Sequence, residues 1–186
     1  VERFDDAAPL TGAVAVLPSA FNPPTRAHLH LLAVSAGRLG AAQAALLTTR
    51  NVAKGLTGAS HEQRVEMLLA AKATTPALAV LAANQARIVD QAALLRSAFP
   101  RATFAFVLGH DTFVRLFDSS YYGDMAAELA PFFEDHRLVV TNRAQHSIGE
   151  AEEFVAAHAA RFATRITLLE IDEHHASLSS TVARGH

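Results

Sequence analysis

Two short polar segments near opposite ends of the chain carry side chains suited to binding phosphate. The first, Thr25-Arg26-Ala27-His28, follows an apolar run and the stiff turn Asn22-Pro23-Pro24. Thr25 and His28 are three residues apart at the expected start of a helix, where unpaired N–H groups and the positive end of the dipole attract an anion. This spacing predicts a phosphate site that includes an imidazole. A plain N-cap followed by a surface histidine is the alternative.

The second segment, Ser177–Arg184, places several hydroxyl side chains at the mouth of an expected helix. Arg184 lies about one turn beyond Thr181 on the same face, so hydroxyls and a guanidinium could together hold phosphate oxygens. An ordinary serine cap on a terminal helix would read the same way. Together the two segments point to a polyphosphate ligand more strongly than either does alone.

The residues between these segments read as alternating strands and helices. Short apolar runs predict strands at Ala13–Phe21, Ala44–Thr49, Leu78–Ala83, Thr103–Leu108, Leu138–Thr141 and Ile166–Ile171. Helical periodicity predicts helices through Leu29–Ala36, at His61–Thr74, at Ile88–Phe99, from about Gly149 to Phe162, and from Ser177 onward.

Continuous apolar strands separated by amphipathic helices predict an α/β fold with a doubly wound parallel sheet covered on both faces. Residues 1–186 suit a single domain of ordinary size. Ligands of such sheets bind at the carboxyl ends of the strands. The loops expected to line the site therefore follow Phe21, Thr49, Leu108, Thr141 and Ile171.

Composition narrows the classes of function. The chain has no cysteine, which excludes a thiol nucleophile and cysteine-based metal sites, and its net charge of −2 argues against gripping a nucleic-acid backbone. No long apolar run or signal-peptide pattern is present, so we expect a cytoplasmic protein without membrane contact. The P-loop and dinucleotide glycine signatures are also missing.

The paired motifs give the chain a family resemblance. F-N-P-P-T-x-x-H at Phe21–His28 and L-S-S-T-x-x-R at Leu178–Arg184 resemble signatures of the HIGH-motif nucleotidyltransferase superfamily, with its Rossmann-like fold. Within it, the chain looks most like the nicotinamide and nicotinate mononucleotide adenylyltransferases. Two departures stand in the first motif: Ala27 replaces a glycine, and Ser19-Ala20 replaces Gly-Ser, which adds methyl groups near the α-phosphate.

The resemblance implies transfer of AMP from ATP to the mononucleotide, with release of pyrophosphate. It implies catalytic roles for Thr25, His28 and Arg184. The residues implied to bind ATP are Ala20, Phe21, Thr25, His28, Ser179, Ser180, Thr181 and Arg184. Those implied to bind the second substrate are Asn22, Lys54, Gly109, Asp111, Tyr122 and Arg143. The chain has no tryptophan, so Tyr121 or Tyr122 could stand in for a ring-stacking tryptophan of the family, or both could be ordinary buried or surface tyrosines.

Several of these assignments have ordinary alternatives. Lys54 could be a solvated loop charge, Asp111 a helix cap and Arg143 a surface ion-pair residue. Mg²⁺ is expected on the ATP phosphates, because it needs few protein ligands. No protein-held metal is expected, because His110 and the His174-His175 pair lack partners at ligand spacing.

Adenylyl transfer explains the residue types without a general base. The attacking phosphate monoester is largely dianionic at neutral pH, so hydrogen-bond donors and cations suffice to align two polyanions. Two other readings stay open: adenylyl or cytidylyl transfer to another phosphorylated acceptor such as phosphopantetheine, and a noncatalytic nucleotide-binding module. The partners expected are ATP and a small phosphorylated substrate, and a homo-oligomer is compatible with the sequence.

Overall fold

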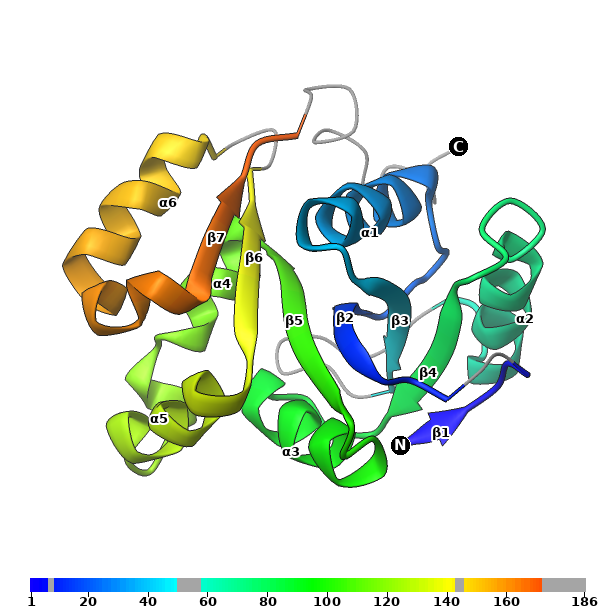
Figure 1. Ribbon diagram of the computed structural model, residues 1–186, viewed down its shortest axis with the longest axis horizontal. Coiled ribbons are helices and arrows are strands. Elements are labelled where there is room, and N and C mark those ends of the chain that lie inside the picture. The colour runs from blue at the N-terminus through cyan, green and yellow to red at the C-terminus, as the bar shows by residue number, and fades with distance from the viewer. Residues whose placement is uncertain (7–8, 50–57, 143–145, 172–186) are drawn as a thin grey trace.

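The computed structural model describes residues 1–6, 9–49, 58–142 and 146–171, and one seven-stranded sheet runs through them (Figure 1). The strand order is β1-β4-β3-β2-β5-β6-β7, with every neighbouring pair parallel except β1 with β4. The strands are β1 (Glu2–Arg3), β2 (Gly12–Ser19), β3 (Ala42–Thr48), β4 (Ala79–Ala83), β5 (Ala102–Gly109), β6 (Arg137–Thr141) and β7 (Ile166–Leu169).

Six α-helices connect the strands in the described ranges. They are α1 (Arg26–Leu39), α2 (His61–Ala71), α3 (Ile88–Ala98), α4 (His110–Leu116), α5 (Met125–Asp135) and α6 (Ile148–Phe154). Short 3₁₀ and π-helical turns occupy Ser119–Tyr121, Val155–Ala159 and Ala160–Arg165. Within these ranges none of the helices has the length and apolarity needed to cross a membrane.

Alternate side chains of each central strand enter different cores. Val14 and Val16 of β2 belong to the core that contains α3, α4, α5 and α6, whereas Ala15 and Leu17 belong to the core that contains α1 and α2. All four side chains are at most 5% exposed. Both faces of the sheet are thus covered, which confirms the doubly wound α/β prediction.

The strand order reverses between β2 and β5. The chain builds outward from β2 through β3 to β4, then crosses back and builds through β5 and β6 to β7 on the other side (Figure 1). A crevice forms at such a switch point, outside the carboxyl ends of the two central strands. Helix α1 follows β2 directly, so the N-terminus of α1 opens onto this crevice.

Several boundaries differ from the sequence prediction. The first predicted strand ends at Ser19, before Phe21, and the predicted helix from Gly149 to Phe162 is α-helical only to Phe154, continuing as a π turn and a 3₁₀ turn. The edge strand β1 and the helices α4 and α5 were not predicted. Helix α5 contains Pro131, which has no N–H to donate to the helix. Because a proline is normally taken to end a helix, the sequence pattern did not predict α5. The predicted helix from Ser177 lies outside the described residues.

A buried histidine sits in the aromatic part of the core. His136, 4% exposed, follows α5 and packs against the rings of Phe104, Phe106 and Phe132. Its Nδ1 has no hydrogen-bond partner. Burial, with a smaller effect of Arg96, lowers the pKa of His136 from 6.5 to about 4. The folded protein therefore holds this imidazole neutral.

This burial should make folding stability depend on pH. Because the folded pKa lies below the unfolded one, the unfolded chain takes up a proton first as the pH falls. The free energy of unfolding should then drop between pH 6.5 and about 4, by about 3 kcal/mol at the low end. Urea denaturation across this range should show the slope in the wild type and in exposed His158→Gln, but much less of it in His136→Leu. An equal slope in His136→Leu would contradict the assignment.

Candidate functional site

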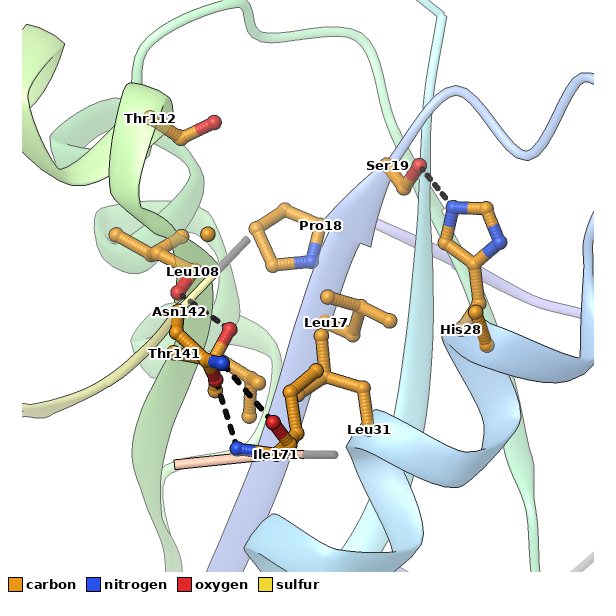
Figure 2. A pocket seen from close by; sticks show the side chains of 13 residues that line it. Leu17, Pro18, Ser19, His28, Leu31, Leu108, Thr112, Thr141, Asn142 and Ile171 are labelled. Carbon is orange, nitrogen blue, oxygen red and sulfur yellow. Dashed lines mark hydrogen bonds between the residues drawn. The ribbon is translucent and has the colours of Figure 1, made fainter. Parts of the chain in front are cut away.

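A pocket of about 130 Å³ lies at the switch point of the sheet (Figure 2). Its walls come from the ends of β2, β5 and β6, from the first turns of α1 and α4, and from the residue that follows β7 by two positions. The lining residues include Ser19, Ala27, His28, Gly109, Asn142 and Ile171. Three of the five loops predicted to surround the ligand are represented here: the loop after Phe21 leads to Ala27 and His28, and those after Leu108 and Thr141 supply Gly109 and Asn142. The loop after Ile171 lies outside the described residues. Thr49, which precedes the remaining predicted loop, is described but does not line the pocket.

Thr25 and His28 form a reciprocal cap at the start of α1. The Thr25 hydroxyl accepts a hydrogen bond from the His28 backbone N–H, at 3.4 Å, and the Thr25 backbone N–H donates to His28 Nδ1, at 3.0 Å. The Thr25 hydroxyl is also 2.7 Å from Nδ1. Histidine takes the place that glutamate or glutamine usually fills in a capping box. Thr25 is therefore an N-cap, as the alternative interpretation expected. His28, however, is hydrogen-bonded to Thr25 and is not simply a surface histidine.

The cap assigns the tautomer of His28. Because Nδ1 accepts from the Thr25 backbone N–H, the proton of the neutral ring is assigned to Nε2. Nε2 lies 3.4 Å from the Ser19 hydroxyl at the pocket wall, so it donates toward that oxygen (Figure 2). The site therefore presents an N–H donor beside a helix N-terminus, an arrangement that suits an anion.

The loop between β2 and α1 is tightly constrained. Phe21 has a φ of 45°, in the left-handed region that residues other than glycine rarely adopt, and it is 1% exposed. Its ring packs on the imidazole of His28 with centroids 5.1 Å apart. Its backbone N–H donates to the Ser19 hydroxyl at 3.3 Å. The backbone at Ala20 and Phe21 is thus fixed where the ATP contact was predicted.

Arg64 of α2 holds the same loop by hydrogen bonding to its backbone. It is 4% exposed, and it donates to the carbonyl of Ala20 at 3.1 Å and to the carbonyl of Ser60 at 3.2 Å. Burial lowers the pKa of its guanidinium, partly offset by Glu62, but arginine stays charged in proteins. Sequence analysis missed this residue, although Arg64 shares a helix face with buried Leu68 and so was placed to be buried.

Asn142 joins the ends of β6 and β7 at the opposite wall. Its side-chain N–H donates to the carbonyl of Ile171 at 2.9 Å, and its side-chain oxygen accepts from the Ile171 N–H at 2.7 Å (Figure 2). The side-chain amide of Asn142 thus pairs with the Ile171 backbone as a neighbouring strand would, and it holds Ile171 beside the end of β6. Asn142 was also missed, although a polar residue directly after a predicted strand was the available signal.

Three of the residues predicted to bind the second substrate, Gly109, Asp111 and Asn22, are described by the structure near the ends of β2 and β5. Gly109 lines the pocket, and Asp111 is exposed in the first turn of α4, where Gly109 rather than Asp111 is the N-cap. Asn22 is 7% exposed and accepts from the Ala59 N–H at 3.1 Å, so it also ties the loop before α2. Its role toward a substrate stays a prediction.

Tyr122 is not among the described residues that line the pocket. Its hydroxyl donates to the Leu116 carbonyl at 2.7 Å, and Arg87 stands 5.5 Å from its ring centroid. Burial raises the pKa of Tyr122 to about 12, so the hydroxyl keeps the proton that it donates. These contacts explain the tyrosine structurally and do not favour its predicted stacking role.

The remaining predicted residues lie outside the described part of the chain. They are Lys54, Arg143, Ser179, Ser180, Thr181 and Arg184. The expected meeting of both motifs around one triphosphate therefore stays a prediction. Ile171, the last described residue, does line the same pocket as His28.

Comparison with known proteins gives the class of this site. Residues 16–184 match the family model described as cytidylyltransferase-like, which spans both predicted motifs. The chain belongs to this family, within the HIGH-motif nucleotidyltransferases, as the resemblance implied. A search of curated protein sequences finds no match.

Solved structures agree on the fold. Nicotinic acid mononucleotide adenylyltransferase of Plasmodium falciparum, complexed with NaAD, superposes with a TM-score of 0.69 over 94% of this chain and 83% of that one, at 16% identity. Its complex with APC superposes equally well, at 15% identity, over 93% of this chain and 82% of that one. At such identities the likeness establishes the Rossmann-like nucleotidyltransferase fold.

Replacing Arg64 should disturb both stability and the nucleotide loop. Arg64→Met leaves the carbonyls of Ala20 and Ser60 without their charged donor, so the free energy of unfolding should fall by about 2 kcal/mol. ATP affinity, measured by calorimetry on the folded variant, should fall as well. Arg96→Met, at an exposed position of α3, is the matched control. Unchanged ATP affinity in Arg64→Met would show that the loop keeps its shape without this support.

Removing the side-chain bridge at Asn142 should loosen β7. Asn142→Ala loses both hydrogen bonds to Ile171, and about 1 kcal/mol for each is the expected loss of stability. Hydrogen exchange should then accelerate at the Ile171 amide more than at Leu108 on the central strand β5. Equal protection of Ile171 in both proteins would mean that the bridge does not hold the strand end.

Proposed function

We propose that this protein transfers AMP from ATP to nicotinate or nicotinamide mononucleotide, a step of NAD biosynthesis. The observation that carries the proposal is the Thr25–His28 cap, which directs an N–H donor into the switch-point pocket of a chain that belongs to the cytidylyltransferase-like family. The similarity of fold to the Plasmodium adenylyltransferase favours this acceptor over others.

The reaction needs alignment and charge stabilisation more than proton transfer. A phosphate oxygen of the mononucleotide forms a bond to the α-phosphorus of ATP, and the bond from that phosphorus to the bridging β-phosphate oxygen breaks, releasing pyrophosphate. The attacking oxygen is already ionised near neutral pH. No general base is therefore required of the pocket.

His28 would act as a neutral donor. Its Nε2–H is directed to the pocket wall, where an α-phosphate oxygen can replace the Ser19 hydroxyl as acceptor. Negative charge that grows on the α-phosphoryl oxygens in the transition state strengthens this hydrogen bond. Thr25 holds the ring, and the start of α1 adds its N–H groups and dipole.

The other proposed roles follow the family motifs. Ala20 and Phe21 would contact ATP through the loop backbone, and Ser179, Ser180, Thr181 and Arg184 would bind the β- and γ-phosphates. Asn22, Lys54, Gly109, Asp111 and Arg143 would contact the acceptor, with Tyr122 the least favoured of the predicted set.

Mg²⁺ would be held by ATP itself. The described residues that line the pocket include no carboxylate, and this fits an ion that keeps its waters and is carried by substrate phosphates. When bound, the ion neutralises phosphate charge. The methyl group of Ala27 lines the pocket where the family has glycine, so the α-phosphate should sit slightly farther from α1.

The proposal predicts a specific activity and its loss. Protein incubated with ATP, Mg²⁺ and either mononucleotide should release pyrophosphate and form the dinucleotide, measured by a coupled assay and by chromatography. His28→Ala should lower kcat/KM by about 10²-fold or more, because one preorganised donor to the transition state is gone. His28→Gln, which keeps a side-chain N–H, should lose less.

His158→Ala is the matched control, since His158 is exposed on the π turn after α6. Wild-type protein inert with both mononucleotides would reject the proposal. Activity with CTP or with phosphopantetheine instead would identify another acceptor or nucleotide. ATP binding without pyrophosphate release would identify a noncatalytic nucleotide-binding module.

A further inference from the structure

A cluster of possible metal ligands lies beside the pocket, and it includes His110, for which no ligand partner was predicted. His110 and Asp111 begin α4, and His146 stands just before α6. Each offers one ligand atom, and the three atoms lie within 4.8 Å of one another. Gly109 and Thr112, on either side of the pair in the chain, line the pocket. The cluster is therefore at the pocket edge.

His110 is buried without a visible use for its ring. It is 8% exposed, and its Nε2 has no hydrogen-bond partner. A buried polar nitrogen left unpaired is costly, so it calls for an explanation. Its ring stacks on that of His146 with centroids 4.3 Å apart and planes 19° from parallel.

His146 is oriented from both sides. Its Nε2 is 3.4 Å from Asp111 Oδ1, and its Nδ1 is 3.6 Å from Glu150 Oε1, just beyond hydrogen-bond distance. The other oxygen of Glu150 accepts from the Ser147 N–H at 2.6 Å in the capping box of α6. In metal sites the histidine nitrogen that does not bind the ion usually donates its N–H to a carboxylate, and Glu150 lies close enough for a small shift to make that hydrogen bond.

Two imidazoles and a carboxylate select a particular class of ion. Mg²⁺ prefers oxygen ligands, whereas Zn²⁺ and its neighbours bind imidazole nitrogen at about 2.0–2.1 Å. A tetrahedral ion with such bonds needs ligand atoms about 3.3 Å apart, so the cluster must contract. Because the His146 ring stacks on that of His110, the two rings can direct nitrogens at one ion only if the His146 ring, which is 33% exposed, rotates out of the stack.

We propose that His110, Asp111 and His146 form a binding site for one divalent transition-metal ion of the zinc class, with Glu150 as the outer-shell partner of His146. Three protein ligands leave a fourth position of a tetrahedral ion for water or a substrate oxygen. The site is separate from the Mg²⁺ expected on the ATP phosphates. Metal binding by these three residues does not require the proposed adenylyl transfer, although Asp111 is also one of the residues proposed to contact the acceptor.

The test measures metal binding directly. Purified protein is titrated with Zn²⁺ against a chromophoric chelator, and with Co²⁺ while its visible absorption is recorded. The wild type should bind one equivalent of Zn²⁺ and give the intense Co²⁺ bands of a tetrahedral site. His146→Ala should weaken Zn²⁺ binding by more than about 10-fold, because even outer-shell partners are worth 10- to 100-fold.

Two further variants keep the result interpretable. Asp111→Asn should weaken binding while changing little of the fold, and exposed His158→Ala should bind Zn²⁺ as the wild type does. His110→Gln tests the buried ligand, with thermal unfolding to verify that the variant is folded. Zn²⁺ binding that survives His146→Ala and His110→Gln unchanged would overturn the proposal, since other histidines such as His174 and His175 would then hold the ion. Failure of the wild type to compete with the chelator would overturn it too.

Discussion

The pocket depends on one reciprocal hydrogen-bonded cap, between Thr25 and His28 at the start of α1. This cap gives backbone N–H groups at the start of α1 their hydrogen-bond acceptors, holds the imidazole in place and assigns its proton to Nε2. The strained Phe21 and the buried Arg64 hold the preceding loop so that the cap faces the crevice between β2 and β5. The chemistry we propose needs nothing from this region except a correctly placed donor and a helix N-terminus.

The sheet explains why such a donor is useful at this place. Parallel strands that reverse order leave a crevice at their carboxyl ends, and the loops that leave these ends are free to vary. Ser19, Gly109 and Asn142 each stand within one residue of a strand end, and each lines the pocket. The fold therefore supplies the position, and a few polar groups supply the selectivity for an anion.

Sequence reasoning succeeded where a signal is local. Apolar runs located the six parallel strands, and the Thr25–His28 spacing located the helix start that carries the candidate site. It missed β1, which has two residues, and α5, which contains Pro131. Contacts between distant residues left no local pattern: Arg64 reaches Ala20 across 44 positions. Separation in the sequence likewise hid the meeting of His110 with His146.

The proposed reaction depends most directly on His28 acting toward a nucleotide as a neutral Nε2–H donor. Long-range ¹H–¹⁵N correlation spectra of the histidine side chains, recorded with and without a nonhydrolysable ATP analogue, test it directly. We expect the Nε2–H tautomer in both states, with the Nε2 resonance of His28 shifting when the analogue binds. A proton on Nδ1, or a His28 signal indifferent to a bound nucleotide, would contradict it.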